Sequence, residues 1–321
     1  MTSLVTFGEA MVRLTPPGGA FQRLEQAHSF DVYVGGAELN VAALAARLGV
    51  ASRWVSRLPD NALGRMIANR AREQGVDVHV EWAPEARAGL YFVELGVAPR
   101  PSSVLYDRAG SAISRVTPGS IDWGASVFAG ARWYHVSGIT PALSDGAAEV
   151  TAESLAAAKK AGLTVSYDLN YRSKLWSAEQ ARAVQEPLME HVDVLITTEE
   201  DARVVFGVGA ESAESLAKRF ELSAVAITSL RESPGAAIVA AEGKVHTAPR
   251  YEVDVVDRFG AGDAFCGGLI VSRLENRGWD DAVRFATATS ALKHSIPGDF
   301  CLVTRAEVDE LLRGASLRVS R

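Results

Sequence analysis

The sequence predicts an α/β fold in which helices cover both faces of a mainly parallel sheet. Three observations predict it. A chain of 321 residues with 48% hydrophobic and 22% charged side chains can bury a large core. Short β-rich runs alternate with helix-patterned stretches along most of the chain, which is typical of βα units. Near residues 85–118 the alternation stops, and strand patterns follow one another without a helix between them.

Each element is justified by its pattern and its place in this alternation. The predicted strands of the large sheet are, in chain order, "LVTFGEAMV" (4–12), "ASRWVSRL" (51–58), "ARWYHVSGI" (131–139), "LTVSYDLN" (163–170), "DVLITT" (193–198) and "AVAITSL" (224–230). The predicted helices are "ELNVAALAARLG" (38–49), "GRMIANRAREQG" (64–75), "EVTAESLAAAKKAG" (149–162), "AEQARAVQEPLMEHV" (178–192) and "ESAESLAKRF" (211–220). Helical connections between strands of one sheet favour parallel pairing.

Two segments, about 13–33 and 85–118, are predicted to form a small β flap over one edge of the main sheet. The second contains two strand patterns separated by turn residues. Further along, "GAAIVAAEGKVHTA" predicts a hairpin that turns at Glu242 and Gly243. Two or three helices are expected after it. We therefore interpret residues 1–321 as a single domain with the flap inserted.

The stretch "DVVDRFGAGDAFCGGLI" (254–270) places glycines and one carboxylate between a strand-like run and a helix-like run. In an open α/β sheet, ligands bind where a loop leads into a helix. Gly260 and Gly262 permit close backbone approach, and free amides at a helix start favour an anion. Taken alone, Asp263 is equally well interpreted as an N-cap on a glycine-rich turn.

The loop does not match the two common phosphate-binding motifs. The sequence contains no GxxxxGK[ST] string, and position 265 is Phe where a dinucleotide fingerprint would require Gly. A carboxylate beside an anion hole can accept a proton from a hydroxyl while amides stabilise a transferring phosphoryl group. The loop therefore predicts kinase chemistry.

Composition argues against several other classes. The formal net charge is −6 with interspersed charges, so no basic stripe for nucleic acid is expected. Cys266 and Cys301 show no CxxC spacing, which favours a reduced, cytoplasmic protein. The amino terminus lacks a signal-peptide pattern, and no run of residues is apolar enough to span a membrane. The six histidines form no HExxH motif, and no GxSxG elbow is present.

"GAGDAF" leading into a helix, together with "YVGGAELNVAALAARLG" near the amino terminus, resembles the ribokinase-like (phosphofructokinase-B type) carbohydrate kinases. The similarity covers nearly the whole chain. Within that family, "GLYFVE", "YDRAGSA", "VSGITPALS", "DLNYR" and "ALKHSIPGDF" are similar to 2-keto-3-deoxygluconate kinases. The resemblance implies a ribokinase-like three-layer sandwich, with the β flap acting as a lid over the sugar.

The resemblance also implies roles for single residues. Asp263 matches the general base, and Gly260, Ala261 and Gly262 match the anion hole. The residues expected to bind the sugar are Gly35, Gly36, Asn40, Tyr91, Tyr106, Arg108, Arg172 and Asp299. Two arginines near the pocket favour an acidic sugar.

Plainer interpretations of the sugar-binding residues remain open. Gly35, Gly36 and Asn40 would also suit a glycine turn followed by a helical Asn, and the flap residues would suit an ordinary exposed strand. Arg172 could instead form a structural ion pair with Asp168. Asp299 could stabilise a turn.

On the nucleotide side, the resemblance implies that Ser229, Arg231 and Gly235 contact ATP together with Gly260 and Gly262. The segment 198–201 stands where the family has Asn-x-x-Glu, so Asp201 is expected to hold Mg²⁺ through water. This chain departs from the family pattern at positions that bear on nucleotide preference: Leu230, Arg231, Arg258, Phe259 and Thr287.

The favoured hypothesis is an ATP- and Mg²⁺-dependent kinase that phosphorylates the terminal hydroxyl of 2-keto-3-deoxy-D-gluconate. The alternatives are a kinase for a neutral sugar such as fructose or ribose, a kinase for the galactonate epimer, and a non-catalytic sugar or nucleotide sensor. An exposed flap with one apolar face is expected to pair with a second copy, giving a homodimer or a higher assembly.

Overall fold

The computed structural model describes residues 2–19, 22–208, 213–229 and 235–314. Its main feature is a nine-stranded sheet in the order β13-β12-β11-β10-β9-β8-β1-β4-β5. In that order the strands are Lys244–Pro249, Gly235–Ala241, Ala224–Thr228, Val194–Thr198, Thr164–Asp168, Trp133–Ser137, Leu4–Phe7, Ser52–Pro59 and Asp77–Ala83. From β11 to β5 all neighbours are parallel, whereas β12 and β13 form the predicted antiparallel hairpin.

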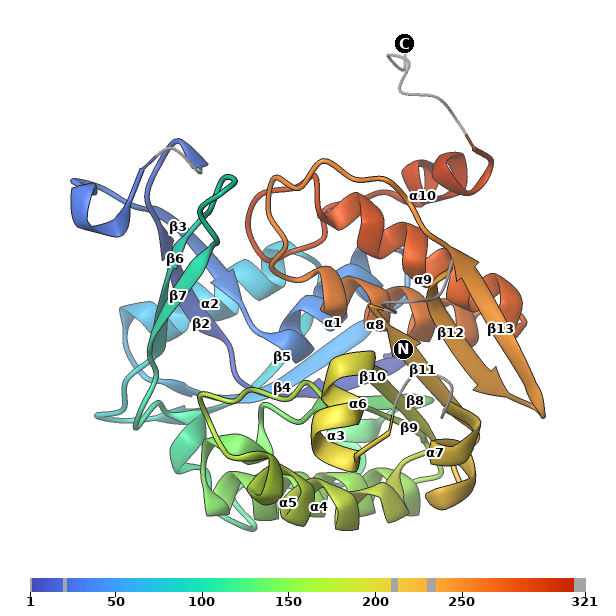
Figure 1. The fold of residues 1–321 in the computed structure, drawn as a ribbon. Helices are drawn as coiled ribbons and strands as arrows, with labels where there is room; N and C mark the ends of the chain where they lie inside the picture. The colour runs from blue at the N-terminus through green and yellow to red at the C-terminus, as the bar shows by residue number, and fades with distance from the viewer. Residues whose placement is uncertain (1, 20–21, 209–212, 230–234, 315–321) are drawn as a thin grey trace.

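Helices cover both faces of this sheet, so the predicted three-layer α/β fold is confirmed (Figure 1). One face packs against α3 (Ala125–Phe128), α4 (Asp145–Lys160), α5 (Ala178–Leu188), α6 (Glu199–Phe206) and α7 (Ala213–Arg219). The other face packs against α1 (Ala37–Arg47), α2 (Ala62–Glu73), α8 (Ala261–Leu274), α9 (Trp279–Lys293) and α10 (Arg305–Leu312). Among the described residues, no helix is both long enough and apolar enough to cross a bilayer.

A second, four-stranded sheet stands beside the main domain in the order β3-β2-β6-β7 (Figure 1). Its strands are Asp31–Gly35, Met11–Thr15, Gly89–Glu94 and Ser103–Asp107. They come from the two segments expected to form the flap, but β2 begins and β3 ends two residues outside the expected bounds. We call this element the small sheet.

The single strand predicted at 4–12 is wrong. The chain forms β1 as far as Phe7, leaves the large sheet at Gly8, and begins β2 of the small sheet at Met11. Gly8 lies at the break, and no side chain fits there, because a Cβ on Gly8 would lie 2.1 Å from the buried carboxylate of Glu38. The edge strand β5 was not predicted, since its half-exposed alternation of polar and apolar residues lacks the strong apolar run of the inner strands.

Local signals explain several helix starts. Ser177 and Thr304 begin α5 and α10 with reciprocal capping boxes to Gln180 and Glu307, and the Ser144 hydroxyl caps α4. The parallel strands β1, β8, β9, β10 and β11 all end at one edge of the sheet. The loops that follow them therefore gather there, as expected for an open α/β sheet.

Candidate active site

A pocket at this edge brings the predicted sugar-binding residues together. It is lined by Glu9, Met11, Gly35, Gly36, Ala37, Asn40, Tyr91, Tyr106, Arg108, Ile139, Arg172, Phe259, Gly260, Asp263 and Asp299. We call it the inner pocket. Residues from the small sheet and the turn before it, from the starts of α1 and α8, and from the loop after α9 thus share one cavity, although they are as much as 290 positions apart in the chain, from Glu9 to Asp299.

Asp263 lies in the first turn of α8, where Gly260 is the N-cap with φ of 83°. The interpretation of Asp263 as an N-cap is therefore wrong. Its Oδ2 accepts a hydrogen bond from Asn40 Nδ2 at 2.6 Å. Burial raises the pKa of Asp263 to about 6, and the Asn40 hydrogen bond and the positive charge of Arg172 oppose that rise. Asp263 is therefore ionised at neutral pH but close to its titration range.

The predicted anion-hole amides lie at the start of the same helix. The N–H of Ala261 donates to the carbonyl of Arg258 at 3.2 Å, so it is already used in the turn. A Cβ on Gly262 would meet nothing within 4 Å, which leaves space beside this position for a ligand. The helix dipole adds a partial positive charge at this end of α8.

Asp168, at the end of β9, is a buried carboxyl beside Asp263. Burial raises the pKa of Asp168 to about 8, and the negative charges of Asp263 and Asp201 add to the effect while Arg172 opposes it. Its Oδ2 accepts from Asn170 Nδ2 at 3.1 Å. Its raised pKa favours the protonated form of Asp168 at neutral pH, which reduces the negative charge beside Asp263.

Arg172 forms no ion pair with Asp168. Its guanidinium donates only to the carbonyl of Tyr171, at 3.2 Å, and no carboxylate of the described residues lies within ion-pair distance of it. The side chain is exposed and lines the inner pocket. The hypothesis of a structural ion pair is therefore wrong, and Arg172 has donors available for a ligand.

Arg108 differs from Arg172 because it already has a partner. Its guanidinium forms an ion pair with the buried carboxylate of Glu9, which also accepts from the Ser111 hydroxyl. The Arg108 guanidinium lies 5.6 Å from the centre of the Tyr106 ring. Glu9 was not predicted as a site residue, and it compensates much of the charge that Arg108 would offer a ligand.

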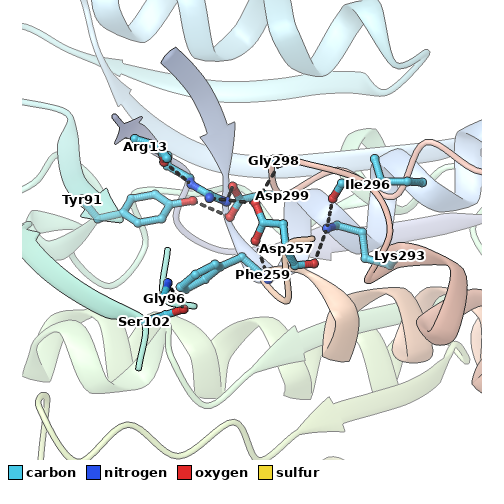
Figure 2. A network of polar contacts seen from close by, with 11 residues as sticks. Arg13, Tyr91, Gly96, Ser102, Asp257, Phe259, Lys293, Ile296, Gly298 and Asp299 are labelled. Carbon is cyan, nitrogen blue, oxygen red and sulfur yellow. Dashed lines mark hydrogen bonds and ion pairs between the residues drawn. The ribbon is translucent and has the colours of Figure 1, made fainter. Parts of the chain in front are cut away.

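Asp299 lines the inner pocket, but its side chain is buried and belongs to a polar network (Figure 2). Its Oδ1 accepts from the Tyr91 hydroxyl, and its Oδ2 accepts from Arg13 Nη1 at 3.0 Å. Arg13 also donates to Asp257 Oδ2 at 2.7 Å. Both oxygens of Asp299 are thus engaged by the protein itself, which agrees better with a structural role than with direct sugar binding.

One face of the small sheet faces this region. In register across the sheet, Tyr33, Arg13, Tyr91 and Tyr106 form a single row. Arg13 is fully buried and lies 4.9 Å from the ring centre of Phe259. Arg13 and Asp257 were not predicted, although a charged residue inside the apolar strand "MVRLT" is a signal that sequence analysis could have used.

A second pocket lies on the other side of the start of α8. Its lining is Thr198, Thr228, Ser229, Ala236, Ala237, Arg250, Tyr251, Val253, Ala261, Gly262, Phe265, Thr287, Ser290, Ala291 and His294. Ser229, predicted to contact a nucleotide, is in this lining and has a positive φ of 56°. Gly235 begins the neighbouring β12. Arg231 lies outside the described residues.

No ready-made metal centre is present in the described part of the chain. Among those residues, no group of three or more His, Cys, Asp or Glu is arranged to hold a metal ion. Asp201 lies in the first turn of α6, where burial raises its pKa and Arg172 opposes the rise. It could supply one carboxylate to a cation held mainly by other ligands.

Known proteins resemble the chain over its whole length. A family model described as pfkB family carbohydrate kinase matches residues 1–299. The 2-dehydro-3-deoxygalactonokinase of Haloferax volcanii is 41% identical, with 99% of each chain covered. The 2-dehydro-3-deoxygluconokinase of Thermoproteus tenax is 34% identical, with 98% of this chain and 95% of the relative covered. The crystal structure of 2-dehydro-3-deoxygluconokinase from Thermotoga maritima superposes with a TM-score of 0.91 at 43% identity, covering 98% of each chain.

Proposed function

Because the chain belongs to the pfkB family of carbohydrate kinases, we propose that it transfers the γ-phosphoryl group of ATP to the terminal hydroxyl of 2-keto-3-deoxy-D-gluconate. The observation that carries this proposal is the position of the start of α8 between two pockets. Asp263 and Gly260 line the inner pocket, while Ala261 and Gly262 line the second. A base and an anion-binding helix start are thus placed between a sugar and a nucleotide.

In this mechanism Asp263 takes the proton from the attacking hydroxyl as the oxygen–phosphorus bond forms. Asn40 holds the carboxylate in place through its hydrogen bond. The amides of Gly260 and Gly262 and the dipole of α8 stabilise the negative charge on the transferring phosphoryl group. The proton ends on Asp263, and ADP leaves from the second pocket.

The second pocket suits the nucleotide because most of its lining side chains are small and because it includes the glycine-rich helix start. Ser229 and Gly262 would contact the phosphates, with Gly235 and Arg231 nearby in the chain. When bound with ATP, Mg²⁺ would neutralise phosphate charge. It needs few protein ligands because it keeps several waters, and Asp201 would contact it through one of them.

The cations of the inner pocket support an acidic sugar. Arg172 has free donors in a planar fork that matches a carboxylate. Arg108 is paired with Glu9, so we assign carboxylate recognition chiefly to Arg172. A cleft of about 1070 Å³ shares Arg108, Arg172 and Tyr106 with the inner pocket and offers a route for the sugar. Tyr91, Gly35 and Gly36 would complete the sugar site.

The galactonate epimer is the second candidate substrate, since the relative from Haloferax volcanii carries that name. An ADP-release assay with ATP and Mg²⁺ against 2-keto-3-deoxygluconate, its galactonate epimer, fructose and ribose tests the proposal. Preference for the gluconate compound would support it, and preference for its epimer would change the named substrate. Preference for a neutral sugar would overturn acid recognition, and no turnover with any of the four would favour a non-catalytic sensor.

Replacing Arg172 by Ala tests the assignment of the carboxylate contact. Loss of a charged, paired hydrogen bond should lower kcat/KM for the sugar acid about 10- to 100-fold. Arg172→Lys should recover only part of it, because an ammonium cannot grip a carboxylate with two parallel bonds. Arg70→Ala, which removes an exposed cation on α2, is the control and should leave the value unchanged. An unchanged kcat/KM in Arg172→Ala would contradict the assignment.

The remaining parts of the proposal concern the whole protein. We infer that residues 1–321 act as one catalytic domain, and that the small sheet is the lid that closes over the inner pocket and excludes water. The outer face of that sheet would pair with a second copy. A cytoplasmic location agrees with the supply of ATP and with two buried, unpaired cysteines, Cys266 and Cys301.

A further inference from the structure

Lys293, the last residue of α9, is fully buried. Its ammonium donates to the carbonyl oxygen of Ile296 at 2.8 Å and to that of Asp257 at 3.4 Å (Figure 2). Within the described residues, no carboxylate oxygen lies within ion-pair distance of its Nζ. Burying a lysine ammonium against main-chain carbonyls alone is costly, so its presence calls for an explanation.

The two carbonyls belong to the two loops that meet at the start of α8. Asp257 lies three residues before Gly260, and Ile296 lies two residues before Gly298. The side chain of Asp257 already joins these loops, because its Oδ1 accepts from the amide of Phe259 and its Oδ2 from the amide of Gly298, both at 3.0 Å. Lys293 joins them a second time through their carbonyl groups.

Gly260 packs directly against the loop after α9 and the side chain of Lys293. A Cβ at Gly260 would lie 2.1 Å from the carbonyl oxygen of Asp299 and 3.4 Å from Cε of Lys293. The N-cap of α8 therefore packs against the loop after α9 with no room for a side chain. Since Asp263 and Gly262 follow it in the first turn, any shift of these loops would move the proposed base and the anion-binding amides together.

The charges around Lys293 are balanced only if its ammonium is included. Arg13 pairs with both Asp257 and Asp299, which leaves one excess negative charge in a buried region. Burial lowers the pKa of Lys293, while the nearby carboxylates of Asp257 and Asp299 raise it. As the second cation, Lys293 makes the group neutral, which reduces the cost of keeping these ions out of water.

We propose that Lys293 is a positioning residue whose ammonium serves as a built-in cation, holding the carbonyls of Asp257 and Ile296 and thereby the glycine loop in the geometry that phosphoryl transfer requires. Lys293 lines neither pocket, so it acts through the loop and not on a ligand. This inference rests on the proposed function. Loss of the ammonium should therefore lower kcat while leaving the KM values for sugar and ATP nearly unchanged.

The test is chemical rescue of Lys293→Ala. The variant should lose about 10²-fold in kcat, the scale expected when a reacting group is misplaced. Ammonium or methylammonium chloride should restore part of kcat by placing a small cation between the two carbonyls. Tetramethylammonium chloride at equal ionic strength should not, because it is too large and has no N–H donor. Lys160→Ala, at an exposed position of α4, is the control and should resemble wild type with every salt.

A second measurement does not depend on kinase activity. Ammonium and methylammonium should raise the unfolding temperature of Lys293→Ala more than that of wild type, whereas tetramethylammonium should not. If wild type phosphorylates none of the sugars, the proposed function fails, while this selective stabilisation still tests the cation role. Stabilisation that is equal for all three salts would overturn that role.

Lys293→Gln covers the case in which the Ala variant does not fold. The amide keeps donors for a carbonyl but lacks the charge, so it should fold and still lose kcat. Wild-type kcat in a folded Lys293→Gln, or in Lys293→Ala without added amine, would overturn the proposal. Failure of both variants to fold with the salts absent, and recovery of folded protein only when small ammonium ions are present, would support it.

Discussion

At the scale of single residues, the hydrogen bond from Asn40 to Asp263 helps set the pH above which the proposed base is ionised and can accept a proton. The bond stabilises the ionised carboxylate, whereas burial favours the protonated form and raises the pKa of Asp263 to about 6. The base must be ionised to take a proton, so activity should fall as the pH falls through this value. Removing the Asn40 donor removes a contribution that lowers the pKa.

We therefore expect kcat/KM of wild type to have an acid limb near pH 6, and that of Asn40→Leu to have its limb at higher pH. Asp263→Asn should lose about 10³-fold above pH 7, where the wild-type base is ionised, and its residual activity should show no such limb. The measurement is the pH profile of kcat/KM with the sugar acid as substrate, whose own carboxyl remains ionised over this range. An Asn40→Leu limb at the wild-type position would mean that the titrating group is not Asp263.

The residues that converge at the site could be predicted from the sequence, but their partners could not. Motif resemblance predicted Asn40, Tyr91, Arg172 and Asp263, and these do line one pocket. It could not predict that Glu9 pairs with Arg108. Glu9 lies just before β2 and Arg108 just after β7, and only the folded small sheet brings these two segments together. The same limit applies to any ion pair between distant segments.

At the scale of elements, the start of α8 depends on two glycines for different reasons. Gly260 has a positive φ and no room for a side chain, since a Cβ would lie 2.1 Å from a backbone oxygen. Gly262 has an ordinary helical conformation with open space beside it, and it lines the second pocket. Gly260 is therefore required by the fold, whereas we expect Gly262 to be required by the nucleotide that would occupy the second pocket.

This difference predicts opposite effects of alanine. Gly260→Ala should lower the free energy of unfolding by about 2 kcal/mol or more, from the left-handed conformation and the clash, and should abolish turnover. Gly262→Ala should raise it by about 0.5–1 kcal/mol through helix propensity, while increasing KM for ATP. Urea unfolding and steady-state kinetics measure the two effects. A stable, active Gly260→Ala would contradict the inference that no side chain is tolerated at the N-cap of α8.

The order of most strands and helices could be predicted because each has its own periodic pattern. The prediction was wrong where two neighbouring elements share one apolar run. Residues 4–12 have the pattern of one strand, but the chain forms β1 as far as Phe7 and begins β2 of the small sheet at Met11, a change of sheet that the pattern does not show. The edge strand β5 was missed because a strand with one neighbour buries less of its surface and so shows a weaker pattern.

At the scale of the whole molecule, the two faces of the small sheet differ. On one face lies the row of Tyr33, Arg13, Tyr91 and Tyr106, of which Tyr91 and Tyr106 line the inner pocket. On the opposite face, Val32, Leu14, Phe92 and Leu105 are in register across all four strands. Val32 is 49% exposed and Leu105 is 61% exposed. Leu14 and Phe92 between them are half-buried, so the stripe is exposed mainly at its two ends. Exposed apolar side chains of this kind on a surface indicate a binding partner.

We expect that partner to be a second copy, because the stripe runs across the sheet from one edge strand to the other, so the same face of a second sheet can cover it. Leu105→Glu should then weaken the dimer about 10²-fold or more, since a two-fold dimer contains the change twice and each leucine contributes about 1.5–3 kcal/mol when buried. Val245→Glu is the matched control, because Val245 is 47% exposed on β13 of the other sheet.

Sedimentation velocity over a micromolar concentration series distinguishes the outcomes. Wild type and Val245→Glu should sediment as dimers at concentrations where Leu105→Glu is a monomer. A wild-type protein that remains monomeric throughout the series would contradict the assignment of this face to a second copy.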